Sequence, residues 1–455
     1  MLSFLPYFSF AQINSAPPST EIIHKQEVRP LPGNLDRIPV FNSNSPELVL
    51  KEGILLSTFP SKGKKHQNAH LNFPFQGRFD IFAHHVAKAS PPSDLRSLYL
   101  GILVKNPGKS SISINILHAA SYLSQPDAPF IDLPSQKNNI FGTVYAGPGS
   151  RVMNDILRNR RQSIFPAQLV IPAGESRMLL NLPIPVKELD PPINGRSTLM
   201  RLQTNGTVYV ASLAMFAAKD KDGIEQSPTL RQWEDLLSNG TLSSPRDKAP
   251  TPPEDTSKAI IYGRVAGVSQ GSVWKASLTD SPQTKYLTIP NPGQALSYGI
   301  STLHRGTLGT NQIQTAPMLR RYSDTAYYAH GNYGVQYSLS LPLRNKSEKS
   351  QEVSLSLQTP IKEDILSQGG LRFLKTPPKR VFFRGTVRIR YNNKQGIPRT
   401  KYVHLVQNRG QKSRSLVTLD MKPNSREFVE VDFLYPPDAT PPQVLTIETM
   451  EKVLN

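Results

Sequence analysis

The chain has 455 residues, of which 38% are apolar, 41 are proline and none is cysteine. This length exceeds what one hydrophobic core normally serves, and the apolar fraction excludes disorder throughout the chain. The absence of cysteine excludes disulfides, thiol catalysis and thiolate metal sites. The formal net charge of +19 favours a polyanion as partner, whether nucleic acid, anionic lipid or an acidic polymer of the cell envelope.

The first residues of the chain predict export. Residues 1–11 form an apolar run in which Ser9 and Ala11 stand where small residues precede a signal-peptide cleavage site. We therefore expect a signal-peptide remnant at residues 1–11 and a periplasmic, cell-envelope or extracellular protein; the alternative is a simple apolar tail. No later run reaches the roughly 18 apolar residues of a membrane-spanning helix, so we expect no transmembrane segment. Residues 12–45 form a proline-rich lead-in.

Short runs of alternating apolar and polar residues then predict strands. At residues 98–104, for example, Leu98, Leu100 and Ile102 alternate with other residues, which is the pattern of a strand with one buried face. The pair Asn205-Gly206 predicts a tight turn directly before one such strand. Further strands are expected at residues 112–116, 176–182, 208–216, 260–265, 337–343, 353–357, 381–391, 402–407 and 427–433.

Two helices are expected among the strands. The apolar spacing of residues 150–161 predicts a short surface helix. Residues 227–239 place Trp233 and other apolar residues on one face, with Gly240 in the position of a left-handed C-terminal residue. A proline-rich segment follows, so we expect residues 227–258 to be a helix and an extended linker between two domains.

The two expected domains repeat one another in part. Asn106 and Asn345 each follow an alternating strand and precede a polar turn and a second strand, and they lie 239 residues apart. A second pair of segments keeps the same order at an offset of 250 residues. We therefore predict an all-β chain of two tandem antiparallel β-sandwiches with Greek-key-like connections, formed by internal duplication, with few short helices. The repeated pairs are residues 98–117 with 337–357 and residues 172–183 with 422–433, and the domains are residues 46–226 and 259–450.

A basic run lies in the second expected domain. Residues 371–414 hold thirteen lysines and arginines and no acidic residue. Along the strand expected at residues 381–391, arginines alternate with apolar residues, which would place a row of guanidinium groups on a solvent-facing sheet face. Such a row is suited to bind carboxylate, phosphate or sulfate. If the row is exposed, its change to serine should remove binding with little loss of stability. The alternative is a solvated face whose acids come from neighbouring strands. The predicted polyanion-binding residues are Arg384, Arg388, Arg390 and Lys401.

Three further sets of residues could carry chemistry. Histidines could share a metal ion, but lysines beside them oppose a cation site. A set of one serine, one histidine and one aspartate lacks the glycine-flanked elbow of a nucleophilic serine. A pair of carboxylates could act in glycoside hydrolysis, but its position in the sequence is typical of a turn. We therefore expect no metal ion and no cofactor, and the sequence assigns no catalytic residue. The sets are His66, His70, His84 and His85; Ser301, His304 and Asp324; and Asp127 and Asp132.

Several longer strings are similar to a known family. They include Phe75-Gln-Gly-Arg-Phe-Asp, Gly147-Pro-Gly-Ser-Arg-Val-Met153 and Leu434-Tyr-Pro-Pro-Asp-Ala-Thr-Pro-Pro442. With these strings the chain resembles, over nearly all of its mature length, an uncharacterised cyanobacterial family, domain of unknown function 3370. The resemblance implies an exported, cell-envelope or extracellular protein, and it transfers no activity and no catalytic residue.

Two functions from different classes follow. The first is a non-catalytic, exported β-sandwich protein that associates with the cell envelope or an anionic extracellular polymer, such as acidic polysaccharide, through the basic sheet face. The second is a carbohydrate-active enzyme of the periplasm or cell surface. Nucleic acid is not the expected partner, because the export signal and the lack of interleaved stacking residues in the basic run argue against it. Two facing carboxylates in a cleft would favour the enzyme, and a flat arginine face would favour the binding protein. The oligomeric state is left open.

Overall fold

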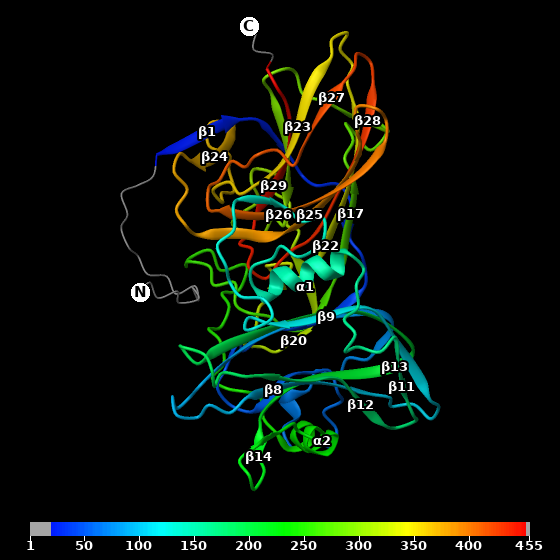
Figure 1. Cartoon of the computed structure of the whole chain (residues 1–455), viewed down its shortest axis with the longest axis vertical. Coiled ribbons are helices and arrows are strands. Elements are labelled where there is room, and N and C mark those ends of the chain that lie inside the picture. The colour runs from blue at the N-terminus through cyan, green and yellow to red at the C-terminus, as the bar shows by residue number, and fades with distance from the viewer. Residues whose placement is uncertain (1–19, 452–455) are drawn as a thin grey trace.

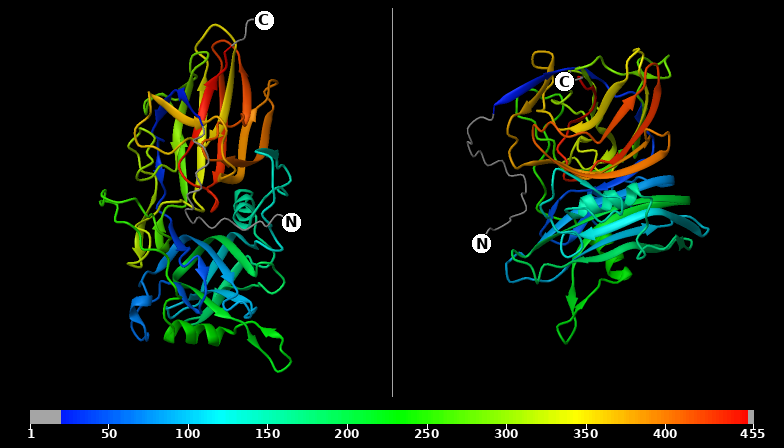
Figure 2. Two further views of the ribbon diagram at one scale, coloured as in Figure 1. Left: turned by 90° about the vertical axis from the view of Figure 1, so that its left-hand side faces the viewer. Right: turned by 45° about the horizontal axis from the view of Figure 1, so that its top comes forward.

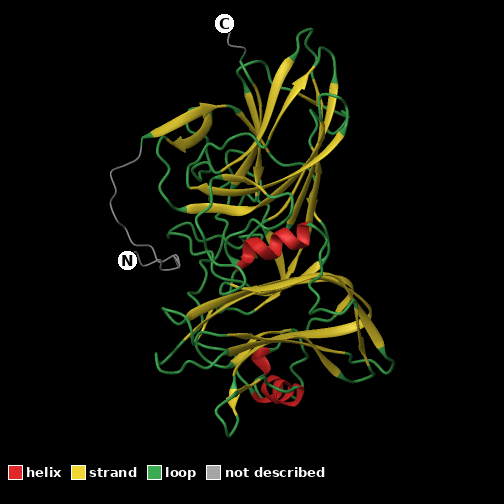
Figure 3. Ribbon diagram, in the orientation of Figure 1, coloured by secondary structure: helices red, strands yellow, loops and turns green. Residues whose placement is uncertain are grey.

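The computed structural model describes residues 20–451, so the predicted signal-peptide remnant lies outside the described residues. Within this range the helices are α1 (Pro148–Leu157), α2 (Leu230–Asn239) and the short 3-10 helix η1 (Gln67–Ala69), and the rest of the regular structure is strand. The strands form two bodies stacked along the long axis of the molecule (Figure 1, Figure 3). The predicted all-β fold is confirmed. No helix of the described part is long and apolar enough to cross a membrane.

The first body is a twelve-stranded sheet that is bent into two layers (Figure 1). Buried side chains such as Phe79, Ile102 and Val210 fill the space between the layers and form one apolar core. Burial of this kind is the main stabilising contribution to the fold. The strands are β4 (Pro39–Ser43), β5 (Leu48–Val49), β6 (Gly53–Ser57), β7 (Phe75–Lys88), β8 (Leu98–Lys105), β9 (Ile112–Leu123), β11 (Gln168–Ile171), β12 (Ser176–Ile184), β13 (Ile193–Phe216), β16 (Ala266–Gln270), β20 (Ala316–Arg321) and β21 (Tyr328–Ala329). A separate two-stranded ribbon pairs β14 (Ala218–Lys219) with β15 (Glu225–Gln226).

The long strand β13 belongs to both layers. Its first part pairs with β7 and β9, and its last part pairs with β6 and β8. The register shifts between Thr204 and Val208, at Asn205 and Gly206. The tight turn predicted at Asn205-Gly206 is therefore wrong, because the backbone passes through this segment as an irregularity within one strand. A Cβ atom on Gly206 would lie 2.4 Å from the Ile112 side chain, so the close approach of β9 requires glycine here.

The second body is a sandwich of two sheets that face each other across a second core, to which Tyr337, Leu355 and Ile447 contribute. Its eight-stranded sheet contains β3 (Asn34–Leu35), β10 (Gln136–Asn138), β17 (Val273–Ser277), β18 (Leu287–Thr288), β22 (Gln336–Arg344), β25 (Val381–Asn392), β26 (Pro398–Asn408) and β28 (Arg426–Leu434). Its five-stranded sheet contains β2 (Glu27–Arg29), β19 (Ala295–Ile300), β23 (Gln351–Gln358), β27 (Val417–Met421) and β29 (Gln443–Thr449). A ribbon of β1 (Glu21–Lys25) and β24 (Gly370–Leu374) lies beside them.

The chain crosses between the bodies more often than a tandem arrangement requires. Strands β1, β2 and β3 of the proline-rich lead-in pair with β24, β19 and β17 of the second body. Conversely, β16 and β20 extend the sheet of the first body. The N-terminal strands, drawn in blue, accordingly lie against the second body (Figure 2). No strand forms at residues 260–265, where one was predicted; the next strand, β16, starts at Ala266.

Helix α1 lies between the two bodies, where it contacts β9, β13, β25 and β28. The prediction of a surface helix is therefore wrong. The apolar side chains of Val152, Met153 and Ile156 are buried, and the polar side chains that share the helix also find partners. Asp155 accepts a hydrogen bond of 2.7 Å from the Tyr122 hydroxyl, and Ser150 contacts His404 of β26 at 2.9 Å. Satisfied polar groups allow every residue of the helix except the half-buried Arg151 to be buried.

Helix α2 covers the outer layer of the first body, close to the residues predicted for it. Thr229 and Gln232 form a capping box, in which each side chain accepts a hydrogen bond from the other's backbone N–H. Trp233 is fully buried. The predicted left-handed residue at Gly240 is wrong, because its φ is −79°. Glycine is required there for another reason: a Cβ atom would lie 2.5 Å from the Leu236 carbonyl oxygen.

The asparagines of the two repeated segments make the same hydrogen bonds. The Asn106 side-chain amide donates to the carbonyls of Ser110, Ile171 and Pro172, and its oxygen accepts from the Gly108 N–H. Asn345 is the matching residue of the second body. Its side-chain amide donates to the carbonyls of Lys349, Met421 and Lys422, and its oxygen accepts from the Ser347 N–H. These contacts support the internal duplication, which stays a prediction.

Candidate functional site

The predicted basic row stands on one face of β25, as the alternation requires, but that face is not open to solvent. The side chains of Arg384 and Arg388 are only 16% and 17% exposed, whereas that of Arg390 is 42% exposed. The cover comes from the first body: α1 contacts β25, and β10 pairs with the neighbouring strand β26. The predicted solvent-facing row is therefore wrong for its first two members.

Each arginine of the row meets a carboxylate. The guanidinium of Arg388 lies 3.1 Å from Asp432, its register partner on β28, and Arg384 lies 3.5 Å from Asp438. Arg390 lies 3.1 Å from Glu430 and 3.4 Å from Asp432. Burial lowers the pKa of the Arg388 guanidinium, but Asp432 and Tyr402 together outweigh burial and raise this pKa above its ordinary value. The contacts match the alternative in which neighbouring strands supply the acids.

Lys401 does not join the row. It lies opposite Ile389 in the pairing of β25 with β26, whereas Arg388 lies opposite Tyr402. Since side chains alternate between the faces of a sheet, Lys401 projects from the other face. Its ammonium group donates a hydrogen bond of 2.8 Å to the Leu416 carbonyl. A role of Arg384, Arg388, Arg390 and Lys401 in polyanion binding stays a prediction.

The other part of the same basic run is exposed. The loop after β24 and the loop after β26 are adjacent, because the backbone N–H of Leu374 donates to Gly410 and that of Arg409 donates to Arg380. Six exposed cations stand on these loops, and we call them the basic rim. Within the described residues the basic rim has one ion pair, of 3.7 Å, between Lys412 and Glu448. Its members are Lys375, Lys379, Arg380, Arg409, Lys412 and Arg414.

A pocket of about 490 Å³ opens beside the basic rim. One wall comes from the β1–β24 ribbon, which contributes Ile22 and His24. The opposite wall comes from the end of β26 and the turn that follows it, and two lysines of the basic rim, Lys375 and Lys412, line the opening. No carboxylate lines this pocket. The arrangement offers positive charge, neutral hydrogen-bonding groups and an apolar surface in one place.

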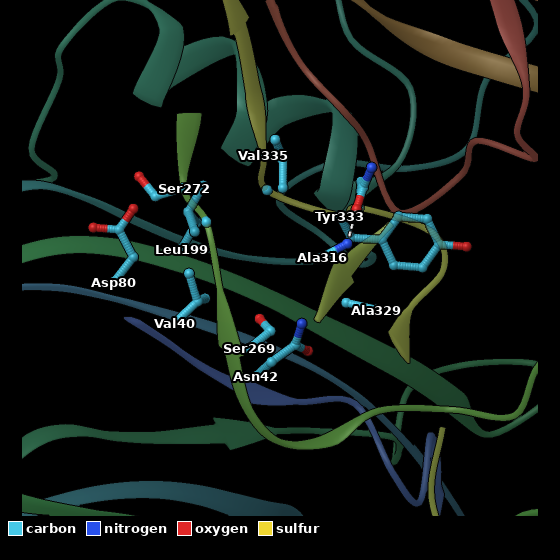
Figure 4. Close-up of a pocket in the computed structure, with 13 residues that line it drawn as sticks. Val40, Asn42, Asp80, Leu199, Ser269, Ser272, Ala316, Ala329, Tyr333 and Val335 are labelled. Carbon is cyan, nitrogen blue, oxygen red and sulfur yellow. Dashed lines mark hydrogen bonds between the residues drawn. The ribbon is translucent and has the colours of Figure 1, made fainter. Parts of the chain in front are cut away.

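A second cavity lies where the two bodies meet (Figure 4). Asn42 and Asp80 of the first body and Tyr333 of the second are among its lining residues. Its volume of about 10 Å³ has room for roughly one water molecule. Burial raises the pKa of the Asp80 carboxyl, although Arg201 and Arg78 oppose the rise. A cavity of this size is a point of contact between the bodies and no site for a substrate.

Comparison with known proteins decides the family. A family model described as Protein of unknown function (DUF3370) matches residues 26–449. The chain belongs to the DUF3370 family. No curated protein matches this sequence. Among solved structures, the crystal structure of the coconut allergen cocosin aligns with 82% of this chain and 77% of its own, at 9% identity and a TM-score of 0.09. That score is too low to support any argument about this DUF3370 protein.

Four histidines of this DUF3370 protein each contact a buried serine. Pairs lie 2.8–2.9 Å apart, and every serine involved is fully buried, so no substrate reaches a serine hydroxyl in this conformation. Burial lowers the pKa of His70, His85 and His404 to about 4. Among residues 20–451 no three potential ligands from histidine, aspartate and glutamate are grouped to hold a metal ion. The pairs are Ser43–His85, Ser57–His70, Ser197–His84 and Ser150–His404.

The other predicted sets are not brought together as catalytic groups. Ser301 is buried and accepts a hydrogen bond from Asn332, while Asp324 pairs with Arg246. Asp127 accepts the backbone N–H of Leu123, as expected of a turn residue. Neither cavity described above contains two carboxylates. The pocket beside the basic rim was not predicted, because its lining residues Ile22 and His24 come from the N-terminal lead-in and the others from distant parts of the chain.

Proposed function

We propose that this protein is a non-catalytic binding protein that associates with an anionic polymer, an acidic polysaccharide of the cell envelope or extracellular space, through the cations of its second body. The observation that carries the proposal is the basic rim. Five of its six cations have no carboxylate partner among the described residues. Clustered charges of one sign attract a polymer of the opposite sign.

The paired arginines of β25 have a smaller part in this proposal than the sequence alone indicated. Arg384 and Arg388 are half-buried and already neutralised by acids. Arg390 keeps the most exposed side chain of the three, so it is the member of the row that can still meet a polymer. The proposed binding surface therefore runs over the basic rim, with Arg390 as a secondary contact.

Binding of the full chain to immobilised polygalacturonate tests the proposal. We expect binding that weakens steeply with salt, because exposed charges are screened beyond about 8 Å at physiological ionic strength. The change of Lys379, Arg380 and Arg409 to serine should weaken binding at least tenfold. The matched control changes Lys51, Lys62 and Lys65, three exposed lysines of the first body, and should weaken it less than twofold. Equal loss in both variants would show that only bulk charge matters, and no binding of the unchanged protein would refute the function.

Export is a separate part of the proposal. It rests on the apolar run of residues 1–11 with Ser9 and Ala11 before the expected cleavage site. N-terminal sequencing of the native protein from a periplasmic or extracellular fraction should find Gln12 as the first residue. A cytosolic protein that retains residues 1–11 would refute export.

A further inference from the structure

We propose that the pocket between the β1–β24 ribbon and the end of β26 holds one carboxylate-bearing sugar unit of the bound polymer. This inference rests on the proposed function and adds to it a defined subsite and a ligand class. The volume of about 490 Å³ lies within the range of about 300–1,000 Å³ that is usual for small-molecule sites. It accommodates a sugar unit and still leaves the pocket open for a chain to continue.

The charge of the pocket selects an anion. Lys375 and Lys412 line it, and no carboxylate does. Lys375 has no ion-pair partner within the described residues, and the only acid within 4 Å of the Lys412 ammonium is Glu448, at 3.7 Å. Lysine ammonium groups are compact point charges that neutralise a carboxylate without requiring a planar geometry.

Neutral hydrogen-bonding groups in the same pocket select a hydroxyl-rich ligand. Asn408 and Ser135 are among the residues that line the pocket. Within the described residues no hydrogen bond occupies the side-chain amide of Asn408 or the hydroxyl of Ser135. The Gln411 side chain is oriented by its oxygen, which accepts the Asn408 backbone N–H at 2.7 Å. Its amide nitrogen is thereby left to donate. The hydroxyls of a sugar can form hydrogen bonds with these neutral groups, whereas a simple inorganic anion would leave several of them without a partner.

An apolar surface completes the match. Ile22 is 39% exposed, and together with Pro377 it lines the pocket. Sugar rings carry apolar C–H faces that pack on such side chains, in the way that ligand pockets combine apolar walls with a few polar groups. His24 packs edge-on against Phe373 at 5.6 Å, and burial and Lys412 lower its pKa. The imidazole is therefore neutral at pH 7 and available to a hydroxyl.

Backbone hydrogen bonds hold the walls of the pocket in place. The Leu374 N–H donates to the Gly410 carbonyl at 2.8 Å, and the Val406 N–H donates to Ser135 at 3.0 Å. The β1–β24 ribbon is paired over five residues of each strand. A preformed site loses less conformational entropy on binding than a mobile loop does.

Calorimetric titration of the full chain with trigalacturonate tests the subsite. We expect saturable binding that the neutral trimer maltotriose does not reproduce. The double change Lys375→Gln with Lys412→Gln should weaken trigalacturonate binding at least tenfold, and Asn408→Ala should weaken it several-fold. The control, Lys349→Gln with Lys422→Gln, removes the same charge from exposed positions elsewhere in the second body and should leave the affinity within twofold. Unchanged thermal unfolding of each variant verifies that it is folded.

The outcomes separate this inference from the proposed function. If the protein binds polygalacturonate but not trigalacturonate, the subsite is refuted and the function stands. If both double variants weaken trigalacturonate binding equally, the pocket has no special role. If inorganic sulfate competes as well as trigalacturonate does, the pocket is a general anion site and the sugar assignment is wrong. If neither polymer nor trimer binds, the function itself fails.

Discussion

The arginine row of β25 and the basic rim belong to one run of the chain, yet they have opposite electrostatic settings. The row lies under α1 and beside β28, and its guanidinium groups meet Asp432, Glu430 and Asp438. The basic rim stands on two loops at the edge of the second body, where one weak ion pair is its only pairing within the described residues. Local charge density in the sequence therefore does not predict free charge on the surface. Whether a basic residue is free depends on whether the elements that pack against it carry carboxylates.

The largest difference between the two regions should be in stability. The change Arg388→Ser leaves the carboxylate of Asp432, only 5% exposed, with Arg390 as its remaining partner. Loss of one member of a fully buried pair costs about 3–5 kcal/mol of unfolding free energy. We expect about 2–3 kcal/mol here, because Arg388 is half-buried and Arg390 remains. Urea unfolding monitored by tryptophan fluorescence measures it.

A second change sharpens the same test. Adding Asp432→Asn to Arg388→Ser removes the unpaired charge and should restore part of the lost stability. If Arg388→Ser alone were as stable as the unchanged protein, the arginine row would have no structural role. This expectation corrects the earlier one that the row can be removed at little cost.

The second largest effect should come from pH. His404 lies beside the row, and burial, followed by Arg384, lowers its pKa to about 4. The unfolded chain has a histidine pKa near 6.5 and takes up the proton first, so stability is complete above pH 6.5 and is lost as pH falls toward 4. At about 1.4 kcal/mol per unit the loss reaches roughly 3 kcal/mol. Urea unfolding of the unchanged protein and of His404→Gln between pH 7 and pH 4 should give curves that converge at low pH; parallel curves would contradict this assignment.

The smallest effect on stability should come from the basic rim. The change of Lys379, Arg380 and Arg409 to serine breaks no ion pair among the described residues, and exposed substitutions usually change unfolding free energy by less than about 0.5 kcal/mol. Thermal unfolding should therefore be nearly unchanged while polymer binding weakens at least tenfold. A large loss of stability in this triple variant would contradict the difference between the basic rim and the arginine row, and would indicate a structural role for the basic rim as well.

Much of the second body could be predicted from its sequence. Period-two alternation placed β22, β23, β25 and β28 close to their observed bounds, because a strand with one buried face must alternate. The same reasoning failed at Asn205-Gly206, which is a turn signal in isolation. There the strands on both sides already have partners in two layers, and continuing the pairing outweighs the local preference.

The sequence by itself determined the all-β class, the charge, the family and the residues that alternate on β25. Only the tertiary structure decided which of the basic residues are free, because the acids that neutralise the row come from β28 and from Asp438, well apart from it in sequence. The proposed subsite depends even more on folding. Ile22 and His24 lie about 350 residues before Lys375 in the chain, and the pairing of β1 with β24 alone brings them together. No local sequence pattern predicts this contact, because it arises from the pairing of strands that are distant in the sequence.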